Sequence, residues 1–425
     1  MCNGSLMDKL ISFSLPLMLS GILQLLFNAV DIIVVGRFTG RQALAAVGST
    51  TALINMFVNL FIGISLGANV LAARFFAAKK EREMSETVHT AIAFALVSGI
   101  GMAFIGVAFA RTALELMGTP DDVIQLSALY MRLYFCGMPF FMLYNYGAAI
   151  LRAIGDTKRP LLFLVIAGVA NVALNLLLVI VFHLGVAGVA IGTIISQMIS
   201  SILVLRCLCK AEASYRLHFS KLSIKGVYMK QIFKVGIPAG IQSTVINFSN
   251  VLLQSSVNSF GSTAMAGYTA ANNIFGFLYA SANSITQACM SFTSQNYGAG
   301  KWKRIDRVVV DCMALTVVIM LALGGGAYVF GHQLLGIYTS DVEVIACGME
   351  ILLYTTVTYF LCGLMDLFPG AMRGMGYSLV PMIISIIGTV GLRIVWIFWV
   401  FPKNRSLDVL FISYPASWIL TILMQ

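Results

Sequence analysis

Long runs of apolar residues alternate along this chain with short segments that carry most of its Lys, Arg, Asp and Glu. A helix needs about 20 mainly apolar residues to cross a bilayer. The runs are continuous rather than alternating, which argues against a transmembrane β-barrel. The pattern predicts an all-α integral membrane protein with twelve transmembrane helices, which run approximately Ile11–Val35, Leu44–Ala73, Thr90–Ala110, Val123–Ala149, Leu161–Phe182, Val186–Leu208, Ile232–Val257, Ala264–Gln295, Val308–Gly331, Val344–Pro369, Val380–Phe401 and Val409–Met424. The last helix is short and has no polar tail, so we expect it to be truncated.

The second half of the chain repeats the first. Residues that recur in the same order include the pairs Asn28 and Asn250, Phe38 and Phe260, Arg152 and Arg373, Gly155 and Gly376, and Pro160 and Pro381. Each half has an even number of predicted spans, so both halves enter the membrane in the same direction. We therefore expect two six-helix lobes related by a parallel pseudo-two-fold repeat. The N-lobe would cover residues 1–208, a basic cytoplasmic linker residues 209–231 and the C-lobe residues 232–425.

Composition narrows the classes of protein that fit these spans. Apolar types make up 59% of the 425 residues and charged types 10%, whereas a soluble domain has about 45–50% and about 25%. A soluble enzyme is therefore excluded. The net charge is +10, and most of the 27 Lys and Arg fall in loops that share one side of the membrane. The positive-inside rule predicts a multi-pass protein of the cytoplasmic (inner) membrane with both termini in the cytoplasm. Because this asymmetry between loops explains the excess of positive charge, we expect no nucleic-acid partner.

Motifs for catalysis and for metal or cofactor binding are missing from the sequence. The eight cysteines show neither a zinc-binding nor a redox spacing. The segment from Gly298 to Lys301 lacks the spacing of a phosphate-binding loop. We expect a protein that is not an enzyme and has no catalytic residues, metal ligands or cofactor.

Asp31, near the outer end of the first span, is the clearest candidate for chemistry within the membrane. Ionisable residues are costly there and are functional candidates by default. Gln24, Asn28 and Asp31 are spaced i, i+4 and i+7, so they share one helix face. Such a carboxylate could bind and release a proton, or share a sodium ion with other oxygen ligands. The alternative is a solvated residue at the outer interface.

Amides and hydroxyls in other spans extend this candidate site. Asn171 and Asn175 lie one turn apart in the fifth span, and Thr193 follows in the sixth. Their oxygens suit a hard cation or a carboxyl group, but such residues also join helices through hydrogen bonds in lipid. A second set of amide side chains within the spans would either line a cavity or pack helices together. It comprises Asn145, Asn247, Asn250, Gln254 and Asn272.

Other charged residues also fall within spans, among them Asp366, Arg132 and Arg393. Asp366 in the tenth span occupies the repeat position of Asn145 and is either a cavity carboxylate or a partner for Arg373. We expect the long side chains of Arg132 and Arg393 to reach the outer surface instead of the protein interior.

Several of these segments resemble the MATE (multidrug and toxic compound extrusion) transporters. The first resembles the signature of that family's first two spans and comprises Asn28-Ala-Val-Asp31, Gly36, Gly40 and Ala43-Leu-Ala-Ala-Val-Gly48. The repeated Arg, Gly and Pro positions resemble the family's loops after the fourth and tenth spans. The resemblance covers essentially the whole chain and is strongest to the bacterial branch related to the DNA-damage-inducible F protein.

The resemblance implies two six-helix lobes around a central cleft, and exchange of protons or sodium ions for organic cations. It also implies a coupling-ion site formed by Asp31, Asn171 and Thr193. Asn175 stands where this branch has a second acid, so Asp31 remains the main candidate and the identity of the ion stays open. Besides this ion, the resemblance implies no cofactor.

We therefore expect a cation-coupled antiporter that exports organic cations or amphiphilic drugs by alternating access, and that functions as a monomer in the lipid bilayer. A flippase for lipid-linked saccharides or lipids, from the same superfamily, is the alternative. It would favour extra spans and a strongly cationic cavity. The repeated halves argue against a channel, and the missing catalytic motifs argue against a membrane enzyme.

Overall fold

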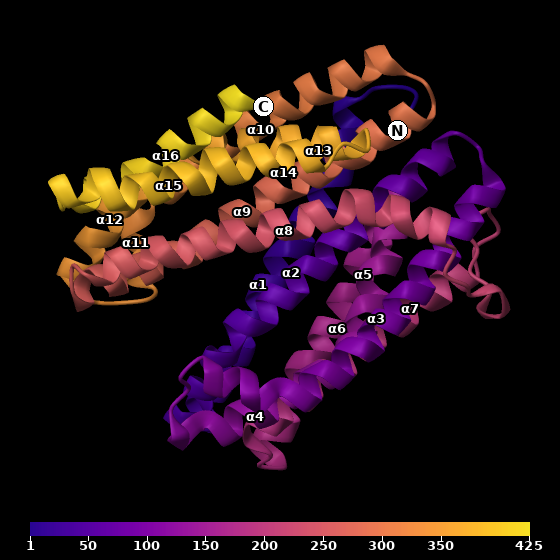
Figure 1. Ribbon diagram of the computed structural model, residues 1–425. Helices are drawn as coiled ribbons and strands as arrows, with labels where there is room; N and C mark the ends of the chain where they lie inside the picture. Colours follow the sequence, from indigo (N-terminus) through magenta and orange to yellow (C-terminus); the bar gives the residue numbers. More distant parts are fainter. The chain divides into compact units, whose positions relative to one another are not determined.

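The computed structural model describes the backbone of residues 1–425, and all side chains except those of Arg41 and Ala52. Its regular structure is helical throughout, without a strand in the described residues (Figure 1). The α-helices are α1 (Met7–Phe38), α2 (Arg41–Ala77), α3 (Glu81–Leu116), α4 (Asp121–Cys136), α5 (Met138–Ala153), α6 (Lys158–Leu176), α7 (Gly185–Cys209), α8 (Gly226–Asn258), α9 (Ser262–Gly298), α10 (Trp302–Val329), α11 (Gly331–Gly336), α12 (Val342–Thr356), α13 (Tyr359–Gly374), α14 (Leu379–Ser385), α15 (Leu392–Val395) and α16 (Leu407–Met424). Short π-helical and 3₁₀ segments join them, namely η1 (Leu177–Val181), η2 (Phe219–Lys221), η3 (Ile386–Gly391), η4 (Trp396–Val400) and η5 (Phe401–Lys403).

The described helices agree with the predicted number of spans. Eight stretches are long and apolar enough to cross a membrane, and there are ten when the pairs α4–α5 and α12–α13 each count as one bent span. Helices α8 and α9 are long enough, but their many amides and hydroxyls keep them outside that group. Their inclusion completes the predicted set of twelve.

Both halves bend their fourth span. Helices α4 and α5 meet at 45°, and α12 and α13 meet at 42°. In the first half, Pro139 follows the break at Gly137 and stands in the first turn of α5. Proline cannot donate a backbone hydrogen bond and disfavours helical geometry in the residue before it, which accounts for this break. In the second half the break precedes Tyr359, whereas Pro369 lies inside α13, so the two prolines are not equivalent.

The chain forms two compact units whose borders fall inside helices. The N-unit is Ile22–Gly236, and the C-unit combines Met1–Gly21 with Ile237–Gln425. Helices α1 and α8 therefore each begin in one unit and end in the other. Each of the two helices contains a proline within six residues of that border, Pro16 and Pro238.

The beginning of α1 belongs to the core of the C-unit. The buried side chains are Leu6, which directly precedes the helix, and Leu10, Phe13 and Leu17 within it. They pack against α9, α10 and α13, and the ring of Phe13 meets that of Phe292 edge-on at 5.6 Å. The first turns of this helix therefore depend on side chains that lie far along the sequence.

The beginning of α8 belongs in turn to the N-unit. A Cβ added to Gly67 would lie 2.2 Å from the carbonyl oxygen of Ile232, and one added to Gly236 would lie 2.5 Å from Cα of Ile64. The backbones of α2 and α8 thus approach each other through glycines, as is common between helices in lipid.

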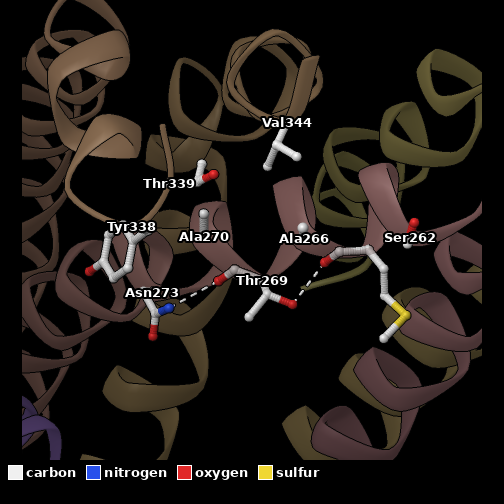
Figure 2. A pocket seen from close by; sticks show the side chains of 9 residues that line it. Ser262, Ala266, Thr269, Ala270, Asn273, Tyr338, Thr339 and Val344 are labelled. Carbon is white, nitrogen blue, oxygen red and sulfur yellow. Dashed lines mark hydrogen bonds between the residues drawn. The ribbon is translucent and has the colours of Figure 1, made fainter. Parts of the chain in front are cut away.

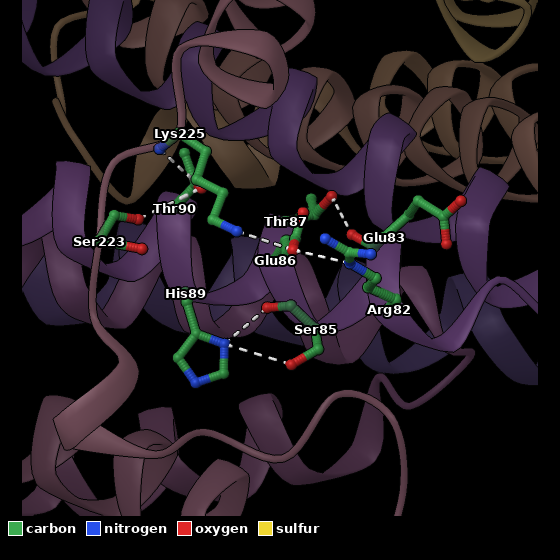
Figure 3. Close-up of polar contacts among 9 residues, drawn as sticks. All are labelled: Arg82, Glu83, Ser85, Glu86, Thr87, His89, Thr90, Ser223 and Lys225. Carbon is green, nitrogen blue, oxygen red and sulfur yellow. Dashed lines mark hydrogen bonds and ion pairs between the residues drawn. The ribbon is translucent and has the colours of Figure 1, made fainter.

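The linker between α7 and α8 is fixed on α3 in the N-unit (Figure 3). His89 donates from Nδ1 to the carbonyl oxygen of Ser85 at 2.6 Å, so Nε2 is free to accept the backbone N–H of His218 at 3.1 Å. The two imidazole rings stack with a 2° angle between their planes. Desolvation, assisted by the charge of Arg216, lowers the pKa of His218, which favours a neutral ring in this stack.

Further along the linker, Lys225 donates to Glu86 at 2.7 Å. Thr90 contributes two contacts: its hydroxyl donates to the carbonyl oxygen of Ser223 and accepts the backbone N–H of Lys225. Contacts at His218, Ser223 and Lys225 therefore fix the second half of the linker to one helix.

Replacing His89 with Ala is expected to speed amide hydrogen exchange at His218 and its neighbours roughly fivefold to tenfold, because one net hydrogen bond is lost. Mass-spectrometric hydrogen exchange on the reconstituted protein measures this. Arg82→Gln is the control: it removes an exposed ion pair with Glu86 and should change exchange in the linker less than twofold. Unchanged exchange in His89→Ala would contradict this role of the histidine.

Candidate functional site

Asp31 ends a chain of hydrogen bonds inside the N-unit. Asn175 donates from Nδ2 to Asp31 Oδ1 at 2.5 Å and to Asn171 Oδ1 at 3.3 Å. Asn171 donates in turn to Thr193 Oγ1 at 3.4 Å, and Thr193 donates to the carbonyl oxygen of Val189. The structure thus brings together all four residues that the sequence indicated as a coupling-ion site, from α1, α6 and α7.

The side-chain amide nitrogen of Asn175 donates hydrogen bonds, but its side-chain oxygen accepts none from the described residues. Its Oδ1 is enclosed and has no hydrogen-bond partner among the described residues. An enclosed carbonyl oxygen without a donor is costly. Together with the carboxylate of Asp31, it offers two oxygens on one side of the cluster that a proton or a small cation could satisfy.

Local sequence explains how the cluster is held. Asn171 and Asn175 lie one helical turn apart on α6. Gly192 faces them from α7, and a Cβ there would lie 2.2 Å from Asn175 Oδ1. The α-helix gives way to the π-helical η1 just after Asn175. Such π segments often occur at functional sites.

Apolar and aromatic side chains shield Asp31. Val34 and Val35, about one turn further along its helix, are buried in a valine cluster with Val179 and Val189. Tyr130 packs against this cluster. The valine cluster thus places buried apolar side chains one turn away from the carboxylate on the same helix.

Sequence reasoning missed the aromatic neighbours of Asp31. Tyr130 and Tyr134, from α4, are close enough to interact electrostatically with the carboxylate, and Tyr134 hydrogen-bonds to Gln197. The one signal in the sequence is that Tyr130 and Tyr134 lie one helical turn apart. This signal is weak, because aromatic residues with that spacing are common in apolar helices.

The other predicted residues of the N-unit lie apart from this network. Gln24 and Asn28 are exposed on the face of α1 that leads to Asp31. Asn145 donates to the carbonyl oxygen of Phe141 in its own helix at 2.8 Å. None of the described residues forms a cluster of three or more His, Cys, Asp or Glu that could hold a metal ion.

The predicted cavity residues of the C-unit are mostly exposed. Asn247, Gln254 and Asn272 are exposed, and Asn250 is half-buried. Asp366 is half-buried and makes no ion pair with a described residue. Arg373, the partner in one of the two sequence-based alternatives, donates to Gln242 Oε1 at 2.5 Å.

The prediction for Arg393 was wrong. Its side chain is 3% exposed and points into the C-unit, where it donates to Ser249, Asn250 and Ser417. Arg132, by contrast, is exposed as expected. The prediction used only the distance of each arginine from the end of its span. It could not show that α8 and α16 offer hydrogen-bond acceptors to Arg393 inside the C-unit.

A pocket of about 470 Å³ lies at the beginning of α9 in the C-unit, beside the segment that joins α11 and α12 (Figure 2). Its side chains are uncharged. Asn273 donates to the carbonyl oxygen of Thr269, and Thr269 donates to that of Met265. The side chains that line the pocket therefore include no charged group, although Tyr338 supplies a phenol hydroxyl.

Comparison with known proteins gives two matches to one family model within the chain. A model described as MatE matches residues 16–177 and again residues 238–399. The matches begin at Pro16 and Pro238, which confirms the internal repeat predicted from the sequence.

Two curated relatives are similar over most of their length. The probable multidrug resistance protein YoeA of Bacillus subtilis (strain 168) is 31% identical over 423 residues, which cover 97% of this chain and 91% of YoeA. The multidrug export protein MepA of Staphylococcus aureus (strain NCTC 8325 / PS 47) is 21% identical over 375 residues, which cover 88% of this chain and 83% of MepA.

Solved structures share the fold. One, described as the outward-facing conformation of a multidrug resistance MATE family transporter of the MOP superfamily, has a TM-score of 0.91 at 20% identity and covers 99% of this chain and 94% of its own. A MOP superfamily transporter from Pyrococcus furiosus, described as having reverse polarity of its binding pocket, has a TM-score of 0.90 at 20% identity with the same coverage. This likeness confirms the predicted fold class.

Proposed function

The chain belongs to the MATE family of multidrug efflux transporters, and we propose that it is a cation-coupled antiporter. It exports organic cations or amphiphilic drugs while protons or sodium ions enter. The coupling ion binds at Asp31. We also propose that the protein lies in the cytoplasmic membrane with both termini inside and acts as a monomer. Within the family, we assign it to the branch related to the DNA-damage-inducible F protein.

The observation that carries the proposal is the enclosed polar chain that ends on Asp31. The carboxylate has no basic partner in this network, and the other side chains of the network carry neutral amides or a hydroxyl. A charge that is not neutralised inside a membrane protein is expensive. A proton or monovalent cation at Asp31 would remove that cost. The free Oδ1 of Asn175 would accept a hydrogen bond from the protonated carboxyl group or coordinate the cation.

Coupling follows from occupancy of this site. An ion that enters from outside binds Asp31 and neutralises it. The contacts between α1 and α6 then change, because Asn175 donates more weakly to a neutral carboxyl group than to a carboxylate. We propose that this change shifts α1 and releases the substrate outward. Release of the ion on the inside resets the cycle.

Efflux of a fluorescent organic cation from proteoliposomes tests this function. Wild-type protein should move the dye under an imposed pH gradient or an imposed sodium gradient, and the rate should saturate with dye concentration. Movement under only the pH gradient would identify the proton as coupling ion. Movement under only the sodium gradient would identify sodium.

Other results would contradict antiport. Dye movement that is equal with and without a gradient, and that does not saturate, is the behaviour of a channel. If neither gradient moves any organic cation, assays of lipid and lipid-linked saccharide translocation in the same vesicles would test the flippase alternative. Empty vesicles are the reference in each case.

A further inference from the structure

Arg393 is a buried cation near the middle of a membrane span. The span of the C-unit that contains it runs from Leu379 to Lys403, and the side chain is 3% exposed. A charged residue at this depth almost always pairs with an opposite charge, lines a wet cavity or serves function. The fate of this charge therefore needs an explanation.

Within the described residues, the partners of Arg393 are all neutral. Nε donates to Ser417 Oγ at 3.3 Å, and Nη1 donates to Ser249 Oγ at 3.2 Å and to Asn250 Oδ1 at 2.8 Å. The ring of Tyr414 stacks on the guanidinium at 4.4 Å. Hydroxyls, amides and an aromatic face orient the group, but none of them carries a negative charge.

Part of the guanidinium is still free. It has five N–H donors in a planar fork, and the described contacts use only Nε and Nη1. Nη2 has no partner among the described residues and is not one of the fully enclosed polar atoms. Tyr414 covers a face of the group and not its edge, so an edge donor remains for a ligand.

The backbone around Arg393 is irregular in a way that is independent of its contacts. Only four residues, α15, are α-helical there. The π-helical segments η3 and η4 adjoin them on both sides. Such π-helical turns are rare in proteins overall, and many of those that do occur lie at functional sites.

Other arginines of the chain do not pose the same question. Arg74, Arg152 and Arg373 lie in the last turns of their helices. There, a helix C-terminus favours a cation and the interface is within reach of a long side chain. Arg393 has neither of these advantages, because helical structure continues after it.

We propose that Arg393 forms an anion-binding subsite in the C-unit, which takes the carboxylate or phosphate group of an amphiphilic ligand. The missing negative charge is then the ligand's, and the free edge of the guanidinium binds its oxygens. Asn250, already bonded to Arg393, lies on α8 between the exposed amides of Asn247 and Gln254 and connects the subsite with them. The class of ligand extends from purely cationic drugs to zwitterionic and anionic amphiphiles. That the ligand is an exported substrate rests on the proposed function. Binding of the ligand at Arg393 can be measured without transport.

A pair of dyes tests this directly. One is a rhodamine ethyl ester and the other the same rhodamine with a free carboxylate. Fluorescence polarisation with the full-length protein in phosphatidylcholine nanodiscs gives both affinities. Wild type should bind the acid more tightly than the ester. Arg393→Gln should bind the acid about tenfold more weakly or worse, since a hydrogen-bonded charge pair is lost, and should bind the ester within twofold of wild type.

Matched controls keep the test decisive. Arg132→Gln removes an exposed span arginine and should leave both affinities unchanged. Retained ester binding shows that Arg393→Gln is folded. An equal loss of both dyes would overturn the subsite, because it would mark Arg393 as a structural contact only. If Arg393→Gln does not fold, wild type alone decides: equal affinity for acid and ester overturns the proposal.

The source of the anion is resolved in a second arm. Nanodiscs that contain phosphatidylglycerol should weaken binding of the acid dye to wild type if a lipid phosphate occupies the subsite. Undisturbed binding assigns the subsite to a transported anion. Failure of gradient-driven efflux with intact acid selectivity would count against the antiport function and not against the subsite.

Discussion

Efflux driven by an ion gradient is expected to fall to the level of empty vesicles when Asp31 is replaced with Asn. The amide has the same size and can still accept the hydrogen bond from Asn175, but it has no charge to neutralise and does not take up a proton. The site then cannot change state with the ion. The measurement is the proteoliposome assay described above, under pH and sodium gradients in turn.

Loss of stability should not account for this result. Replacing a shielded carboxylate with a neutral group of the same shape removes a desolvation cost, so the midpoint of thermal unfolding should stay the same or rise. Asp121→Asn, at the exposed first turn of α4, is the control and should transport like wild type. If Asp31→Asn retains efflux, the coupling site lies elsewhere, and Asp366→Asn becomes the next variant to measure.

Alanine at position 192 is expected to slow gradient-driven efflux roughly 10-fold to 100-fold without unfolding the protein. Its Cβ would lie 2.2 Å from Asn175 Oδ1, so the carboxamide must rotate and its hydrogen bond to Asp31 is lost. A hydrogen bond to a charged group has an effect of this size. Alanine also favours the helix over glycine by about 1 kcal/mol, which offsets part of the local strain.

Gly101→Ala is the matched control, because an added Cβ there has no atom within 4 Å. It should leave the rate of efflux and the thermal midpoint unchanged or slightly raise the latter. Equal efflux in the two variants would mean that the position of Asn175 does not matter for coupling. A large drop in the thermal midpoint of Gly192→Ala alone would indicate a packing role for this glycine.

The sequence was sufficient for most of the fold. Continuous apolar runs are a strong signal for spanning helices, and recurring positions such as Pro16 and Pro238 revealed the repeat. Hydropathy alone was weaker for α8 and α9, whose amides reduce it. The division of α1 and α8 between the two units has no local signal, because it depends on contacts between residues far apart in the chain.

The candidate site could be predicted in part, for a related reason. Asn171 and Asn175 share a helix face, and helical periodicity is enough to place them together. A shared site with Asp31 was implied by the family resemblance, because the spacing of the two asparagines alone fits helix packing as well. The orientation of Arg393 was not predictable, because it depends on acceptors from α8 and α16 that periodicity does not place.

The shared ends of α1 and α8 have a consequence for how the protein is made. The first turns of α1 are synthesised first, but their packing partners begin with Ile285 in α9 and extend to Ala371 in α13. At a synthesis rate of roughly 5–20 residues per second, the start of the chain waits tens of seconds for its place. We therefore expect the two halves, when expressed separately after division at the linker, to be unstable alone and to recover only when they are produced together. The young chain would need protection, by the insertion machinery or a chaperone, until its second half emerges.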